Sequence, residues 1–82
     1  MQGRPDEAIR SWNEALRSEH LGPEGAKAIR FELGEAHEAL GRPGEALWWY
    51  QAVAGIDPDY RGVGGRIARL GGGPGVPPAE SA

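Results

Sequence analysis

Few side chains in this chain of 82 residues are of the kinds that catalyse reactions or bind metals. Cysteine is absent, and of the two histidines His20 lies in an expected loop and His37 in an expected helix. Nucleophilic catalysis needs an activated serine, threonine, lysine or cysteine beside a base. None of the three serines (Ser11, Ser18 and Ser81) lies in a strand-turn-helix setting. The sequence therefore argues against an enzyme, and it predicts neither a metal site nor a cofactor.

Three short segments superficially resemble ligand-binding loops. Residues 62–65 lack the preceding strand and the third correctly spaced glycine of a dinucleotide loop. Residues 71–75 lack the lysine and the hydroxyl residue of a phosphate-binding loop. Residues 57–59 (Asp-Pro-Asp) are too short for a calcium loop, and helix termination is their simpler role. We therefore expect no nucleotide or calcium site.

Acidic side chains recur along the middle of the chain. Glu32, Glu35, Glu38 and Glu45 could act as general acids or bases only if two of them converged in a pocket. A solvated helix face is the simpler interpretation. The total charge of −3 is too small to indicate a nucleic-acid partner, although residues 61–70 alone carry a net +3.

The chain contains no segment that would direct it to or across a membrane. No apolar run approaches the roughly 18 residues of a membrane-spanning helix. The first seven residues lack the apolar stretch of a secretory signal. We therefore expect no membrane partner and a cytoplasmic location.

Apolar residues at helical spacing predict four helices, at about 5–16, 24–40, 43–54 and 60–70. Gly41 follows the second helix, where a left-handed residue commonly ends a helix. The connection to the third helix is so short that these two helices should form an antiparallel hairpin. Residues 1–70 are thus expected to form one helical domain. Residues 71–82 are rich in glycine and proline and predict a disordered tail or linker.

The chain repeats itself. The hexapeptide Gly-Arg-Pro-x-Glu-Ala occurs at residues 3–8 and again at residues 41–46, 38 positions later. Each copy is followed by an aromatic residue at the same offset, Trp12 in the first copy and Tyr50 in the second. Self-similarity of this length is typical of stacked helical repeats, which cannot bury their apolar faces singly.

Residues 27–60 resemble one tetratricopeptide repeat, a helix-turn-helix unit of about 34 residues. Residues 3–16 resemble the second helix of a preceding repeat, and residues 60–70 resemble a closing helix. Arg30 and His37 depart from the family pattern. The residues that match the core positions of the repeat are Trp12, Leu33, Gly34, Ala46, Tyr50 and Pro58.

The resemblance implies an all-α fold, a fragment of an antiparallel helix-turn-helix solenoid. It also implies a non-catalytic module that binds a peptide or partner protein on its concave face. The residues that match groove-facing positions are Ala28, Phe31, Glu35, Glu38 and Ala39. Phe31 lies outside the apolar stripe of its helix, so it is either exposed beside the two carboxylates or packed against the first helix. An exposed Phe31 would favour a partner with an apolar anchor and basic side chains.

Two features of the sequence each allow more than one interpretation. Trp48 either points outward as a secondary contact site or lies under the fourth helix, because Trp48, Trp49 and Tyr50 cannot share one helix face. The first helix lacks a hairpin partner for its apolar face, and repeat arrays usually need about three repeats. The alternative function is therefore a self-assembling scaffold segment, either a homo-oligomer or a fragment of a longer repeat protein.

Overall fold

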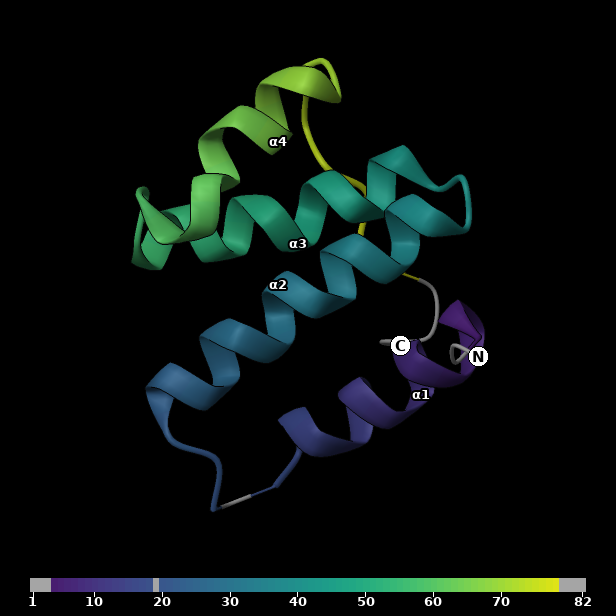
Figure 1. The fold of residues 1–82 in the computed structure, drawn as a ribbon, viewed down its shortest axis with the longest axis vertical. Coiled ribbons are helices and arrows are strands. Elements are labelled where there is room, and N and C mark those ends of the chain that lie inside the picture. The colour runs from purple at the N-terminus through teal and green to yellow at the C-terminus, as the bar shows by residue number, and fades with distance from the viewer. Residues whose placement is uncertain (1–3, 19, 79–82) are drawn as a thin grey trace.

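The computed structural model describes residues 4–18 and 20–78, and within these ranges it is built of helices (Figure 1). The α-helices are α1 (Pro5–Leu16), α2 (Pro23–Ala39), α3 (Pro43–Ile56) and α4 (Val63–Arg69), with a 3₁₀ turn η1 (Tyr60–Gly62) before α4. Three of them begin at proline, whose fixed φ suits the first turn, where its missing N–H costs no hydrogen bond. The all-α prediction is confirmed.

Helix α2 lies in the middle of the molecule, with α1 on one side and α3 on the other (Figure 1). The tight turn at Gly41 makes α2 and α3 an antiparallel hairpin. Gly41 has a φ of 74°, and the backbone N–H of Arg42 donates to the carbonyl of His37 at 2.9 Å. This left-handed helix end confirms the expectation from the sequence.

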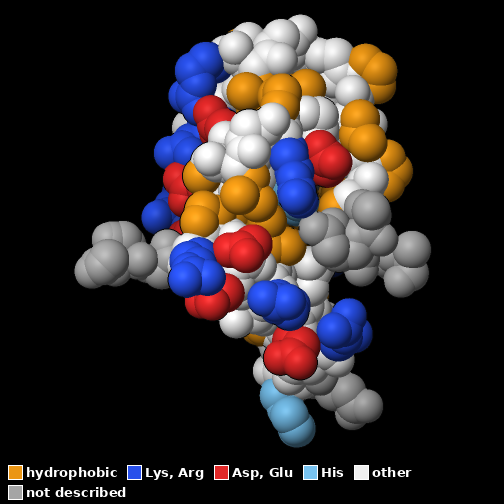
Figure 2. Space-filling model, turned by 90° about the vertical axis from the view of Figure 1, so that its right-hand side faces the viewer, with side chains coloured by type: hydrophobic (Ala, Val, Ile, Leu, Met, Phe, Trp, Pro, Cys, Tyr) orange, Lys and Arg blue, Asp and Glu red, His pale blue; other side chains and the backbone are white. Residues whose placement is uncertain are grey.

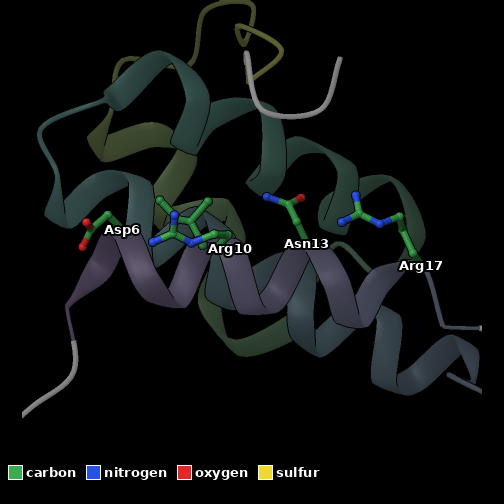
Figure 3. A pocket seen from close by; sticks show the side chains of 5 residues that line it. Asp6, Arg10, Asn13 and Arg17 are labelled. Carbon is green, nitrogen blue, oxygen red and sulfur yellow. The ribbon is translucent and has the colours of Figure 1, made fainter.

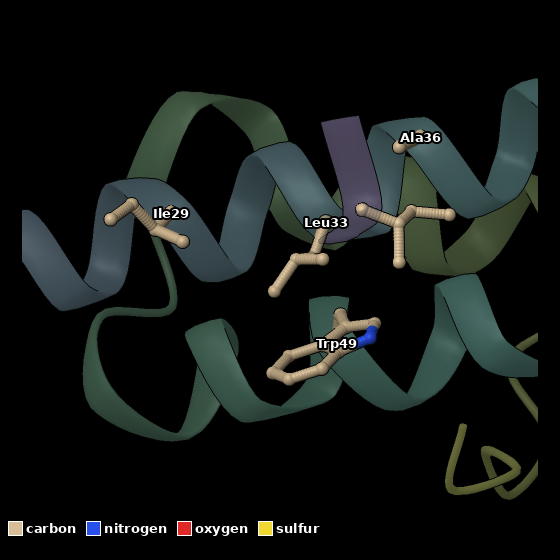
Figure 4. Packing of buried hydrophobic residues seen from close by; sticks show 5 residues of the cluster. Ile29, Leu33, Ala36 and Trp49 are labelled. Atoms are coloured by element: carbon tan, nitrogen blue, oxygen red, sulfur yellow. The ribbon is translucent and has the colours of Figure 1, made fainter. Parts of the chain in front are cut away.

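One hydrophobic cluster joins α1, α2 and α3 (Figure 4). Leu33 of α2 points toward the ring of Trp49 on α3, and Ile29 and Ala36 lie on the same side of α2. Ile9 of α1 completes the cluster and is only 2% exposed. The apolar stripe of α2, formed by Ile29, Leu33 and Ala36, therefore faces α1 and α3. Each fully buried aliphatic side chain contributes about 1.5–3 kcal/mol.

A second cluster lies on the other side of α2, between α2, α3 and α4. Its members are Phe31, Ala46, Tyr50, Val53 and Val63. Tyr50 is fully buried and lies directly over Gly34. A methyl group built at Gly34 would lie 2.5 Å from Cε1 of that ring, so only glycine permits this approach. Gly34, Ala46 and Tyr50, which match core positions of the repeat pattern, are thus buried against one another.

The fourth predicted helix is shorter than expected. The sequence predicts a helix over 60–70, whereas the chain forms η1, with a break inside it, and α4 begins at Val63. The break lies at Arg61 and Gly62, whose φ angles are 47° and 72°. Positive φ is unfavourable for residues with a Cβ, so Gly62 serves here as the left-handed residue from which α4 starts.

Alanine substitutions at Gly62, Gly64 and Gly65 should distinguish the low helix propensity of glycine from the need for a positive φ at position 62. Gly64 and Gly65 lie inside α4, and a Cβ added at either would meet nothing within 4 Å. Gly64→Ala and Gly65→Ala should each raise the free energy of unfolding by up to about 1 kcal/mol. Gly62→Ala should lower it, because alanine disfavours positive φ. Urea titrations of the three variants would check this, and a stabilising Gly62→Ala would contradict the observed break.

The sequence predicts a disordered tail or linker over residues 71–82, of which the structure describes residues 71–78. After α4 the chain turns at Gly71 and Gly72, which both have positive φ, and then runs in extended form along α3. The Gln51 side chain donates to the Gly73 carbonyl at 2.6 Å, and the N–H of Val76 donates to the Gly44 carbonyl at 2.9 Å. We call residues 73–78 the C-terminal strap. Residues 79–82 of the predicted tail lie outside the described residues.

Candidate protein-binding surfaces

Phe31, the central residue of the predicted concave site, is buried. It is 1% exposed, and its ring centroid lies 5.5 Å from those of Tyr50 and Tyr60. The guanidinium groups of Arg61 and Arg66 lie over it at 5.0 and 4.7 Å. Neither expectation holds, because Phe31 is not exposed and the groups around its ring come from α3, η1 and α4 instead of α1. It therefore cannot anchor a partner while α4 is in place.

The predicted acidic residues of the concave face are paired with the chain's own arginines. We call the three pairs Glu32–Arg61, Glu35–Arg66 and Glu38–Arg69 the ion-pair row. The first two span 3.5 and 2.6 Å. The carboxylates lie three residues apart on α2, which places them along one side of the helix. The positive charge of residues 61–70 is thus explained by the docking of η1 and α4 on α2.

Tyr50 connects the ion-pair row to the core. Its hydroxyl donates to Glu38 Oε1 at 2.8 Å and accepts from Arg66 Nη1 at 3.3 Å. Burial raises the pKa of Tyr50 to about 12, and the adjacent Glu38 carboxylate adds to this shift. Burial also acts to raise the pKa of Glu38, but the hydrogen bonds from Arg69 and Tyr50 outweigh it and hold that pKa below its usual value. Both groups therefore keep their paired forms at neutral pH.

A groove lies between the N-terminal half of α1 and α2, with a volume of about 340 Å³. The two helices contribute mostly small or apolar side chains and two carboxylates. We define the α1–α2 groove by Arg4, Pro5, Ala8, Trp12, Glu32, Glu35, Ala36 and Ala39. Two predicted concave residues, Glu35 and Ala39, line it; Ala28, Phe31 and Glu38 do not.

The two copies of the repeat differ in how well this face is covered. Ala46 and Tyr50 of α3 are fully buried because α2 packs on them through Gly34. The equivalent residues of α1, Ala8 and Trp12, are only half-buried and line the α1–α2 groove. The same sequence motif thus meets a helix in one copy and an open groove in the other.

A second hollow, of about 270 Å³, lies along another side of α1 (Figure 3). Asp6, Arg10, Asn13 and Arg17 line it at spacings of four, three and four, with the buried Ile9 beneath them. Within the described ranges, Asn13 Nδ2 is buried without a hydrogen-bond acceptor. This polar face was not predicted from the sequence, although the helical spacing of the four residues is visible there.

Other predicted residues lie in different settings. Leu33 and His37 are fully buried, whereas Pro58 is exposed in the turn that follows α3 and is not a core residue. Trp48 is half-buried, with its ring edge-on to Trp49 at 4.8 Å and its backbone against the C-terminal strap instead of α4.

Lys27 is a structural residue that was not predicted from the sequence. It is buried and bridges Glu24 and Asp57 at 3.0 and 3.1 Å, which ties the start of α2 to the end of α3. Its ammonium group also lies 4.9 Å from the centre of the Tyr60 ring. The family pattern gave no signal for it, because it depends on an acidic residue 30 positions away.

The surface mixes apolar and charged groups. On the face shown in Figure 2, hydrophobic side chains gather in the upper and middle parts, and Lys and Arg alternate with Asp and Glu below them. In the described ranges, no cluster of three or more His, Asp or Glu side chains is placed to hold a metal ion. None of the helices described is long and apolar enough to cross a membrane.

Comparison with known proteins agrees with this architecture. A family model described as tetratricopeptide repeat matches residues 2–61, well over half of the chain. The match includes α1 as well as the α2–α3 hairpin. Comparisons with curated proteins and with solved structures gave no match. The extent of the family match, together with the packing of Tyr50 on Gly34, shows that the chain belongs to the tetratricopeptide repeat family.

Proposed function

We propose that the chain is a non-catalytic protein-binding module whose partner occupies the α1–α2 groove. Tetratricopeptide repeats are in general protein–protein interaction modules, which supports the class of function. The choice of surface is supported by the uncovered motif of α1, where Ala8 and Trp12 lack the helix that covers Ala46 and Tyr50.

The lining of the groove favours a partner with an apolar anchor and basic side chains. Ala8, Trp12 and Ala36 offer apolar contact at its centre. Glu32 and Glu35 lie at its edge, and each side chain is about one-third exposed. Each carboxylate is already paired with one arginine of the ion-pair row. A carboxylate has acceptor sites for more than one donor, so a lysine or arginine of the partner can add to these pairs. By analogy with α2 on α3, a helix with a small residue opposite Trp12 fits best.

Site-specific photo-cross-linking would test this proposal. Ala39 is exposed at the groove, so a benzoylphenylalanine in its place should cross-link the partner in an extract of the producing cells. The same group in place of Ala68, which is exposed on α4, serves as the matched control. Adding Ala8→Arg should remove the Ala39 cross-link by filling the groove, while leaving the circular dichroism spectrum unchanged.

The products would also decide between a partner and self-assembly. A discrete heteromeric product at Ala39 alone, sensitive to Ala8→Arg, supports the proposal. A product of twice the chain mass would instead support the scaffold alternative, with a second copy covering the first helix. Equal products from positions 39 and 68 would refute the groove as the binding surface.

A further inference from the structure

The C-terminal strap binds α3 as an extended peptide would bind a receptor. Gly73 and Gly75 are partly buried, whereas Pro74, Val76 and Pro77 are exposed. Pro78 at its end is buried. The strap meets α3 through backbone hydrogen bonds, through Gly75 beside the Trp48 backbone, and through the Val76 side chain beside Gly44. The contact is therefore made largely to main-chain atoms.

The Gln51 side chain recognises the strap backbone through both of its polar atoms. Its amide nitrogen donates to the Gly73 carbonyl at 2.6 Å, and its amide oxygen accepts from the Gly75 N–H at 3.2 Å. One residue further on, the Val76 N–H donates to the Gly44 carbonyl in the first turn of α3 at 2.9 Å. These three hydrogen bonds hold one line of backbone against one face of α3.

The close approach at Gly75 restricts which sequences can bind. A methyl group built there would lie 2.5 Å from the backbone nitrogen of Trp48. The obstacle is main chain in a helix, which cannot move aside as a flexible side chain would. Gly44 has a similar role opposite Val76, since a Cβ at residue 44 would lie 2.8 Å from Val76 Cγ2. The surface thus accepts only glycine at position 75 of the strap.

We propose that this face of α3, formed by Gly44, Trp48 and Gln51, is a binding site for extended glycine-containing segments. In the isolated chain the C-terminal strap of the same molecule occupies the site. Between molecules, the ligand of the site is the C-terminal strap of a second copy. The turn at Gly71 and Gly72 connects the strap to α4, so the strap can leave α3 by a backbone change at this turn once its three hydrogen bonds break. This site is separate from the α1–α2 groove and does not depend on the function proposed for that groove.

The test uses the full-length chain with its own strap unseated by Gly75→Ala. The ligand is a synthetic peptide of residues 71–78 with blocked ends, and binding is followed by fluorescence anisotropy. The peptide should bind the Gly75→Ala chain saturably and the wild-type chain about tenfold more weakly. This factor follows for a dissociation constant of about 0.1 mM, because a short tether gives the cis segment an effective concentration of about 1 mM.

Matched variants make the result specific to the site. Val76→Ala shortens a half-exposed side chain but keeps the backbone N–H that donates to Gly44, so the chain should remain as weakly receptive as wild type. A second substitution, Gln51→Ala in the Gly75→Ala chain, should abolish peptide binding, and a peptide carrying Gly75→Ala should not bind. Circular dichroism melts check that each variant folds, and ¹⁵N spectra of the wild-type chain at millimolar peptide give an independent reading at the Gln51 amide. Absence of binding to the Gly75→Ala chain, or equal binding of both peptides, would overturn the proposal.

Discussion

Replacing Tyr50 with alanine is expected to lower the free energy of unfolding by about 3–5 kcal/mol. The ring is fully buried in the second cluster, and its hydroxyl donates to Glu38 at 2.8 Å. Truncation would leave a cavity between α2, α3 and α4 and deprive Glu38 of a donor. A chain of this length has a total stability of only about 4–12 kcal/mol, so the variant should be largely unfolded well below the wild-type melting temperature. Urea titration followed by circular dichroism measures the loss.

Two further variants show which interactions of Tyr50 account for this loss. Tyr50→Phe keeps the ring and removes the hydroxyl, and should cost about 1 kcal/mol, the net contribution of one hydrogen bond. Trp12→Ala alters the equivalent residue of the first repeat copy, but Trp12 is only half-buried at the α1–α2 groove. Its loss should be clearly smaller. Equal losses at positions 12 and 50 would contradict the conclusion that the first copy is uncovered.

Features encoded by nearby residues could be predicted from the sequence. The helix starts at Pro5 and Pro43, the turn at Gly41 and the stripe through Leu33 all follow from local spacing and local backbone preference. The family pattern also marks Gly34 and Tyr50 as core positions, and the structure packs the ring of Tyr50 on Gly34.

Features that depend on distant partners could not be predicted in the same way. Phe31 lies outside the apolar stripe of its own helix, and it is buried only because η1 and α4 return with their arginines to cover it. The uneven distribution of charge was visible in the sequence. Which glutamate each arginine pairs with, about 30 residues away, depends on the fold.

The contacts of the C-terminal strap cannot be read from its composition. Glycine and proline in 71–78 indicate a segment with little to bury, and most of its side chains are indeed outside any core. Its order comes from backbone hydrogen bonds to Gln51 and Gly44, which glycine permits by allowing close approach. Such contacts leave no periodic signal in the sequence.

Gly34→Val is the second substitution with a large expected effect, a loss of about 3 kcal/mol in the free energy of unfolding, at the upper end of the usual cost of overpacking. The new Cβ would lie 2.5 Å from Tyr50 Cε1 and 2.6 Å from Cδ1. The ring cannot retreat, because Phe31 packs beside it and its hydroxyl is bonded to Glu38. The same change at Gly64, which faces open space, should alter stability by less than about 0.5 kcal/mol.

A double-mutant cycle would show that the loss at position 34 comes from the ring of Tyr50 and not from the helix backbone. Tyr50→Leu shortens the side chain opposite residue 34, so valine and leucine together should be less harmful than the sum of the single losses. The coupling should reach about 1–3 kcal/mol, as for residues in direct contact. Strict additivity would mean that the two side chains do not meet. In that case the conclusion that Tyr50 is covered by Gly34, whereas Trp12 of the first copy faces the α1–α2 groove, would also be wrong.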